Sequence, residues 1–201
     1  MKPGLSLAWV VASLGCTAPA ASQFATVSGT VDASDVRSVG AVVYLLPEAE
    51  AANPSARDTP VIDQANLRFV PPVLAVLPGT AVEFRNSDPI LHNVFSPKDP
   101  GVGFNLGTYP RHESRLHLFR EVGAHVILCH VHPEMVAWVV VVDTPYRAVA
   151  DGEGRFRIDN VPAGRYAVNV WHQATRPFRR DIVVHEGESL HLTLRLPRSG
   201  R

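Results

Sequence analysis

The chain has 201 residues, and its 19 Lys and Arg residues balance its 19 Asp and Glu residues, so the formal net charge at pH 7 is zero. No dense basic run interleaved with aromatic residues occurs, which argues against nucleic-acid binding. The 17 Pro and 14 Gly residues divide the apolar sequence into short runs, and helical periodicity is almost absent. Together these patterns predict an all-β protein of one or two domains.

The first 21 residues have the pattern of a secretory signal peptide. Lys2 supplies a positive charge, residues 5–15 are apolar, and small residues around Ala20 form a cleavage site. This stretch is too short to span a membrane, and so is the later apolar run 136–142. We therefore expect no membrane span and a periplasmic or secreted protein. Lipid anchoring through Cys16 is an alternative, although the residues before it fit a lipidation signal poorly.

Residues 22–145 are predicted to form the first domain, a β-sandwich. Buried or half-buried strands are expected where apolar residues alternate or run together, namely near residues 25–31, 39–46, 67–76, 80–85, 115–119, 125–129 and 136–142. Residues 47–60, rich in Ala, Pro and acidic residues, are expected to be an exposed insertion. Residues 104–110 are expected to be a loop that crosses the sandwich.

Residues 146–201 are predicted to form a second, smaller β-sandwich module. Apolar residues alternate with polar or small ones through Phe156 and Ile158, through Tyr166–Val170, and again through Leu190–Leu196. This period of two predicts three half-buried strands. So short a chain is near the size at which a separate core becomes marginal, so we expect the module to pack closely on the first domain.

The run Cys129-His130-Val131-His132-Pro133-Glu134-Met135 carries the clearest chemistry in the sequence. Cys129, His132 and Met135 are three residues apart and offer a thiolate, an imidazole and a thioether from one short loop. This donor set selects copper and tunes its redox potential. Once a signal peptide is removed, Cys129 is the only thiol, and an unpaired exported cysteine indicates a liganded or reactive residue.

A trigonal copper site of this kind needs a second imidazole. His92 is the candidate, because it follows a predicted strand that ends in the turn residues Asn86, Asp88 and Pro89. Alternative interpretations remain open: an inert buried Cys129, a core-filling Met135, and a turn role for His92. His130 is expected to face away from Cys129 and to be a surface residue.

These two segments resemble the cupredoxins, the blue copper proteins, and especially their amicyanin-like and plastocyanin-like members. The resemblance covers residues 22–145 and implies a Greek-key β-sandwich with one type 1 copper site that alternates between Cu(I) and Cu(II). It makes His92, Cys129 and His132 the equatorial ligands and Met135 the axial ligand. It also implies that Asn93 hydrogen-bonds toward the cysteine loop and supports the ligands, although plain turn chemistry at Asn93 is an alternative.

The DGxGxFxI run at residues 151–158 and the VPAGxYxVxVW run at residues 161–171 resemble the carboxypeptidase regulatory-like or transthyretin-like module. Modules of this kind bind, space or stiffen, and are not themselves catalytic. The resemblance therefore implies a non-catalytic second unit.

The sequence as a whole predicts an electron-transfer protein rather than an enzyme, with a redox partner such as a cytochrome or a dehydrogenase. A binuclear copper centre would need two cysteines in the loop, and a multicopper oxidase would need several HxH pairs. Structural zinc usually takes four Cys or His ligands. Two other functions stay open: a periplasmic copper carrier or sensor, and a non-redox two-module binding protein of the cell envelope.

Overall fold

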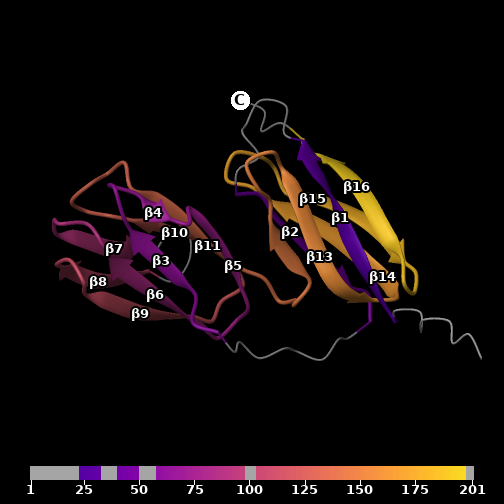
Figure 1. The fold of residues 1–201 in the computed structure, drawn as a ribbon, viewed down its shortest axis with the longest axis horizontal. Coiled ribbons are helices and arrows are strands. Elements are labelled where there is room, and N and C mark those ends of the chain that lie inside the picture. Colours follow the sequence, from indigo (N-terminus) through magenta and orange to yellow (C-terminus); the bar gives the residue numbers. More distant parts are fainter. Residues whose placement is uncertain (1–22, 33–39, 50–57, 98–102, 198–201) are drawn as a thin grey trace, which may run out of the picture.

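A computed structural model describes residues 23–32, 40–49, 58–97 and 103–197, and this part of the chain contains sixteen β-strands and no helix. The predicted all-β class is confirmed. The strands form two β-sandwiches that lie side by side (Figure 1). In the same residues, no helix is long and apolar enough to cross a membrane. The predicted signal peptide, residues 1–21, and residues 50–57 of the predicted insertion lie outside the described residues.

The first sandwich is made of nine strands in two sheets. The five-stranded sheet has the order β5-β11-β10-β7-β8, and the four-stranded sheet has the order β4-β3-β6-β9. The strands are β3 (Val61–Gln64), β4 (Phe69–Val70), β5 (Val73–Val76), β6 (Thr80–Asn86), β7 (His92–Ser96), β8 (Phe104–Tyr109), β9 (Ser114–Phe119), β10 (Gly123–Leu128) and β11 (Val136–Val141). Inward-facing side chains such as Ile62, Phe84, Ile127 and Val139 fill the space between the sheets.

Two predictions for this sandwich were wrong. The strand expected over residues 67–76 is divided into β4 and β5 at Pro71 and Pro72, because proline has no N–H to donate to a ladder. Residues 104–110, expected to be a loop, are mostly strand β8, which pairs with β7 and packs Phe104 and Leu106 against the core. The short strands β3 and β7 were not predicted, since turn residues obscure their alternation.

The second sandwich has seven strands, in sheets of order β13-β1-β16 and β12-β2-β14-β15. Its strands are β1 (Phe24–Asp32), β2 (Val42–Pro47), β12 (Arg147–Val149), β13 (Arg155–Pro162), β14 (Gly164–Trp171), β15 (Phe178–Val184) and β16 (Ser189–Arg195). The three strands predicted from alternation correspond to β13, β14 and β16, whereas β12 and β15 were missed. Two sandwiches are therefore present, as predicted.

Strands β1 and β2, which the predicted boundary places in the first domain, belong to the second sandwich. β1 lies between β13 and β16, and β2 lies between β12 and β14. The inner face of β1, including Val27, packs into the second core with Leu45 of β2. Alternation reveals that a segment is a strand but not which strand pairs with it. A boundary between residues 145 and 146 thus separates strands that pair, and the first sandwich is an insertion between β2 and β12.

The two sandwiches pack on each other through an apolar contact. Val42 of the second sandwich is buried with Val73, Val140 and Val142 of the first. Around this cluster the rings of Trp138 and Trp171 lie 5.2 Å apart, Trp138 Nε1 donates to Gln173 Oε1 at 2.7 Å, and Arg147 Nε donates to the Ala75 carbonyl oxygen at 3.2 Å. The expected close packing of the two units is confirmed.

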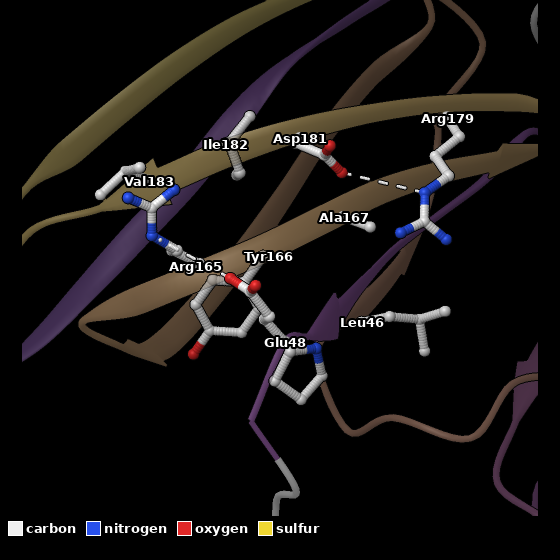
Figure 2. A pocket seen from close by; sticks show the side chains of 10 residues that line it. Leu46, Glu48, Arg165, Tyr166, Ala167, Arg179, Asp181, Ile182 and Val183 are labelled. Carbon is white, nitrogen blue, oxygen red and sulfur yellow. Dashed lines mark ion pairs between the residues drawn. The ribbon is translucent and has the colours of Figure 1, made fainter.

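A hollow of about 650 Å³ lies on the second sandwich, over β14 and β15 and the end of β2 (Figure 2). Its floor includes Ala167, and its charged side chains form two ion pairs, Arg165 with Glu48 at 4.0 Å and Arg179 with Asp181 at 3.8 Å. All four side chains are largely exposed, so these pairs contribute little stability. The hollow contains no histidine or cysteine.

β1 and β2 lie in the same sheets as the strands of residues 146–201, so we predict that residues 146–201 do not fold alone. A fragment of these residues lacks β1 and β2, one inner strand of each sheet, and would expose the core that those strands cover. We expect its far-ultraviolet circular dichroism to show no cooperative thermal transition, whereas the same residues joined to residues 23–49 through a short linker should show one. A cooperative transition in the isolated fragment would contradict the arrangement.

Candidate metal centre

The antiparallel ladder between β7 and β10 brings His92 to Cys129. Leu128, the last residue of β10, is paired with Phe95 of β7, so Cys129 emerges beside the start of β7. His92 is the first residue of β7 rather than the exit of the preceding strand. Its Nδ1 lies 3.9 Å from Cys129 Sγ, and both residues are buried, with exposed fractions of 0% and 3%.

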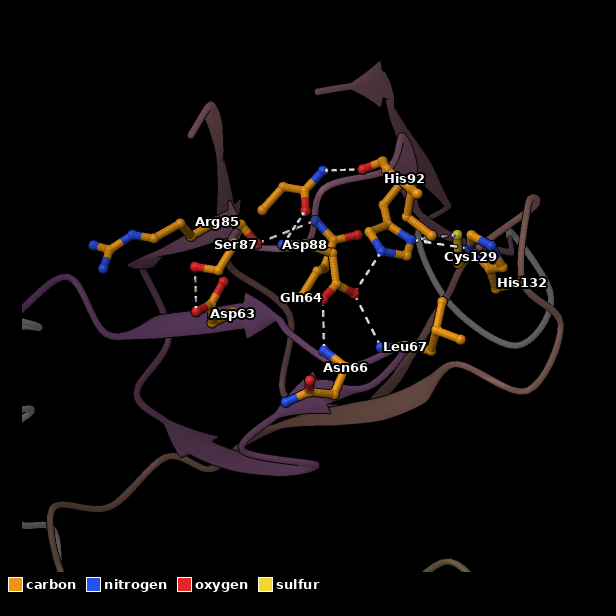
Figure 3. Close-up of polar contacts among 12 residues, drawn as sticks. Asp63, Gln64, Asn66, Leu67, Arg85, Ser87, Asp88, His92, Cys129 and His132 are labelled. Atoms are coloured by element: carbon orange, nitrogen blue, oxygen red, sulfur yellow. Dashed lines mark hydrogen bonds and ion pairs between the residues drawn. The ribbon is translucent and has the colours of Figure 1, made fainter. Parts of the chain in front are cut away.

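His132 completes a cluster of three donors. The loop between β10 and β11 turns back within a few residues, and the Met135 N–H donates to the His132 carbonyl oxygen at 3.0 Å. This turn places His132 Nδ1 3.0 Å from His92 Nδ1. Figure 3 shows both imidazoles and the sulfur converging from the two segments. In the described part of the chain, His92, Cys129 and His132 form the one group of potential metal ligands, with all donor atoms within 4.8 Å.

The separations from His92 Nδ1 to the other two donors fit a single metal ion. Metal–nitrogen bonds in such sites are about 2.1 Å long and metal–sulfur bonds are about 2.3 Å. Two imidazole nitrogens on one ion can thus be at most about 4.2 Å apart, and a nitrogen and a sulfur about 4.4 Å. The measured 3.0 and 3.9 Å satisfy both limits. Two imidazoles and a thiolate are ligands typical of copper electron-transfer sites.

Met135 is buried in the same apolar cluster as Cys129 and is 1% exposed. Its thioether belongs to the residue just before β11, on the loop that carries His132. Core packing accounts for this burial, and the axial role of Met135 stays a prediction.

Asn93 contacts the cysteine loop through its backbone rather than its side chain. The Asn93 N–H donates to Cys129 Sγ at 3.4 Å. Its side-chain Nδ2 instead donates to Asn105 Oδ1 of β8 at 2.9 Å, and the Gly107 N–H donates to the same oxygen. Asn105 was not singled out from the sequence, because residues 104–110 were expected to be a loop.

Asp88 is a further neighbour that the sequence analysis treated only as a turn residue. Its Oδ2 lies 2.9 Å from His92 Nε2, on the side of the ring opposite the donor cluster (Figure 3). The backbone N–H groups of Asn66 and Leu67 donate to the same carboxylate. Asp88 and His92 are four residues apart in the sequence, and this spacing could have predicted the contact.

The environment of Asp88 favours the carboxylate. Burial raises the pKa of its carboxyl, but hydrogen bonds from the Leu67 N–H, the His92 ring and the Asn66 N–H outweigh this effect, so the pKa lies below its ordinary value. Asp88 is consequently ionised at neutral pH. A carboxylate that accepts a hydrogen bond from a ligating imidazole orients the ring and increases its basicity.

A buried polar network holds the turn between β6 and β7. Asn86 Nδ2 donates to the carbonyl oxygens of Ile90 and Tyr109, and Gln64 Nε2 donates to the Tyr109 hydroxyl at 2.7 Å. The Tyr109 hydroxyl donates in turn to the Phe84 carbonyl oxygen. Burial raises the pKa of Tyr109, which keeps this hydroxyl protonated as a donor. The network fixes the segment that ends at His92.

Three other histidines of the first sandwich have contacts away from the donor cluster. His130 is exposed and its ring is stacked on Phe95, with ring centroids 3.6 Å apart, which confirms the predicted surface position. His117 is stacked on Phe104, and His125 Nε2 lies 2.9 Å from the Glu121 carbonyl oxygen. None of these rings belongs to the donor cluster in the described residues.

Comparison with protein families confirms the predicted second module. Residues 135–197 match the carboxypeptidase regulatory-like domain. The match covers β11 to β16 and does not include β1 and β2. No curated protein sequence matches the chain.

Solved structures similar to the chain include copper proteins. A reduced variant of amicyanin is 24% identical, with a TM-score of 0.40, and the alignment covers 49% of this chain and 99% of that one. The Cu-containing nitrite reductase of Thermus scotoductus SA-01 is also 24% identical, with a TM-score of 0.42, over 49% of this chain and 26% of that one. A Cu(I) form of another amicyanin variant is 24% identical, with a TM-score of 0.40, over 49% and 99% of the two chains. Amicyanin is one of the proteins named in the predicted resemblance of the first domain, whereas nitrite reductase was not named there.

The contact between Asn93 and Asn105 predicts that Asn105→Ala destabilises the protein. The substitution leaves the buried Asn93 amide without its acceptor, which costs about 1–3 kcal/mol. Urea denaturation should show a lower free energy of unfolding for Asn105→Ala than for Thr108→Ala, an exposed position on the same strand. Equal values for the two variants would show that β8 does not hold Asn93 in place.

Proposed function

We propose that this chain binds one copper ion through His92, Cys129 and His132, with Met135 as a weak axial ligand, and carries single electrons between redox partners. The observation that carries the proposal is the convergence of two imidazole nitrogens and one thiol sulfur within 4.8 Å. His92 is 37 positions from Cys129 and 40 positions from His132, and only the fold brings it to the loop that these two residues share.

Copper bound there would supply a one-electron couple between Cu(II) and Cu(I). The chain's own contribution is to hold the ligands so that the coordination changes little between these states. His92 is fixed by Asp88, and Cys129 accepts a hydrogen bond from the Asn93 N–H. Metal binding requires the Cys129 thiolate, so loading releases a proton from this residue.

Burial of the ligands excludes water from most of the site, while one ligand remains close to the surface. His92, Cys129 and Met135 are buried, whereas His132 is half-buried. Exposed apolar residues lie in the neighbouring turns, with Ile90 exposed by 42% and Leu91 by 54%. We propose that a partner docks weakly on this apolar rim, formed by Pro89, Ile90, Leu91 and Pro133, and exchanges electrons through His132. Met135 is too buried to contact a partner and is not part of this rim.

The partner would be a redox protein such as a cytochrome or a dehydrogenase, outside the cytoplasm. The signal-peptide pattern of residues 1–21 supports export to the periplasm or secretion. The second sandwich, which packs on the first through an apolar contact, would serve as a non-catalytic support. Delivery or sensing of copper, and a non-redox binding role, are the two alternatives that experiment must separate.

Addition of Cu(II) to the purified protein should separate these functions. Electron transfer predicts an intense visible thiolate-to-copper band and reversible cycling in voltammetry, because the ligand set is held in one geometry. Cys129→Ser should abolish the band, whereas Met135→Gln should keep the colour and shift the reduction potential. Colour without reversible cycling would favour copper delivery. Absence of the band in the unmodified protein would refute the copper site.

The apolar rim predicts that a charge at Ile90 slows electron exchange. Ile90→Lys should leave the copper band unchanged and reduce the rate of self-exchange between reduced and oxidised protein on the order of tenfold at low salt, because two added charges repel in the encounter. Val183→Lys is the matched control, since Val183 is 44% exposed and lies on the second sandwich. NMR line broadening measures both rates. A changed spectrum with an unchanged rate would contradict the docking role.

A further inference from the structure

The carboxylate of Asp88 joins the metal centre to a hairpin on the opposite sheet. Asp88 Oδ2 lies 2.9 Å from His92 Nε2, and the backbone N–H groups of Asn66 and Leu67 donate to Oδ1 and Oδ2 at 2.6 and 2.9 Å. The Asp88 N–H donates in turn to Asn86 Oδ1 at 3.0 Å. The carboxylate is therefore held from one side by backbone groups and faces the imidazole on the other.

The hairpin between β3 and β4 presents these two N–H groups by means of an uncommon backbone conformation. Asn66 and Leu67 have φ values of 54° and 57°, and Ala65 and Arg68 exchange both backbone hydrogen bonds across the turn. Positive φ at both central residues defines a type I′ turn. Asparagine tolerates this region, but a leucine rarely adopts it. Successive N–H groups in such a turn form a concave site for an anion, and here the anion is the Asp88 carboxylate.

We infer that the Asn66–Leu67 turn and Asp88 form a clamp that keeps the hydrogen of His92 on Nε2 and lowers the reduction potential of the proposed copper site. A carboxylate can only accept a hydrogen bond, so the ring nitrogen that faces it carries the hydrogen. A neutral imidazole has one N–H, which leaves Nδ1 with a free lone pair. Nδ1 is the nitrogen that faces Cys129 and His132.

The effect on the potential follows from charge. A carboxylate that accepts from the distal nitrogen makes the imidazole a stronger donor, and a buried negative charge is only weakly screened by salt. Both effects favour Cu(II) over Cu(I). This part of the inference rests on the proposed function, whereas the position of the hydrogen on His92 does not depend on copper.

The simpler interpretation is that Asp88 merely closes the hairpin and the turn after β6. Loss of Asp88 would then lower stability without affecting the His92 ring or the potential. The two interpretations therefore differ in a spectroscopic property of one imidazole.

The first experiment uses the unmodified, copper-free protein. Long-range ¹H–¹⁵N correlation spectra distinguish an imidazole with its hydrogen on Nε2 from one with its hydrogen on Nδ1. We expect His92 to carry the hydrogen on Nε2 at neutral pH. A hydrogen on Nδ1 would overturn the clamp, whether or not the protein binds copper.

The second experiment compares Asp88→Asn with Asp63→Asn. Asp63 is a nearby carboxylate that accepts from Ser87 Oγ at 2.7 Å, so its removal tests the loss of charge without the contact to His92. Asp88→Asn offers Nε2 a donor as well as an acceptor, and we expect a mixture of both ring forms. In the copper-loaded protein we expect the preference for Cu(II) over Cu(I) to fall about tenfold, which corresponds to a potential higher by ~59 mV. Asp63→Asn should shift both readouts much less.

Leu67→Gly tests the hairpin separately. Glycine keeps the backbone N–H and adopts positive φ freely, so this variant should retain the His92 ring form and the potential while unfolding at a higher temperature. An unchanged ring form and potential in Asp88→Asn, or an equal shift in Asp63→Asn, would overturn the inference. If Asp88→Asn does not fold, the ring form of His92 in the unmodified protein decides whether the clamp exists. If no blue copper site forms at all, the proposed function fails while the ring form still tests the clamp.

Discussion

The register between β7 and β10 is the constraint on which the metal centre depends. Pairing of Leu128 with Phe95 fixes where Cys129 emerges, and it places the Asn93 N–H against the sulfur. Because the side-chain period of a strand is two, a slip of one residue would turn His92 away from the loop. The buried network of Asn86, Gln64 and Tyr109 then holds the turn that delivers His92.

The two histidines of the metal centre are constrained from opposite sides. The short loop that ends at Met135 constrains His132, while Asp88 constrains the far side of the His92 ring. Asp88 follows β6 and contacts the β3–β4 hairpin of the same sheet, and its carboxylate reaches across to His92 of the other sheet. An electron carrier benefits from such an arrangement, since ligands that do not move require little reorganisation when the charge of the metal changes.

The second sandwich extends this rigidity to the outer face of the five-stranded sheet. β11, which follows the ligand loop directly, is covered by Val42 and Trp171 of the second sandwich. The first sandwich enters this unit after β2 and leaves it before β12, so it is tethered at both ends. The two sandwiches are therefore joined by two connections and one apolar contact.

The sequence by itself determined the all-β class, the spacing of Cys129, His132 and Met135, and the candidacy of His92, because alternation and ligand spacing are local properties. It did not determine that β1 and β2 pair with strands more than a hundred residues away, since the alternation of one strand does not identify the strand that pairs with it. The roles of Asp88, Asn105 and the Asn66–Leu67 turn were likewise decided by tertiary structure. In the sequence these residues are typical of turns or loops. Pairing of β7 with β8 brings Asn105 to Asn93, whereas the packing of the two sheets brings Asp88 and the Asn66–Leu67 turn to His92.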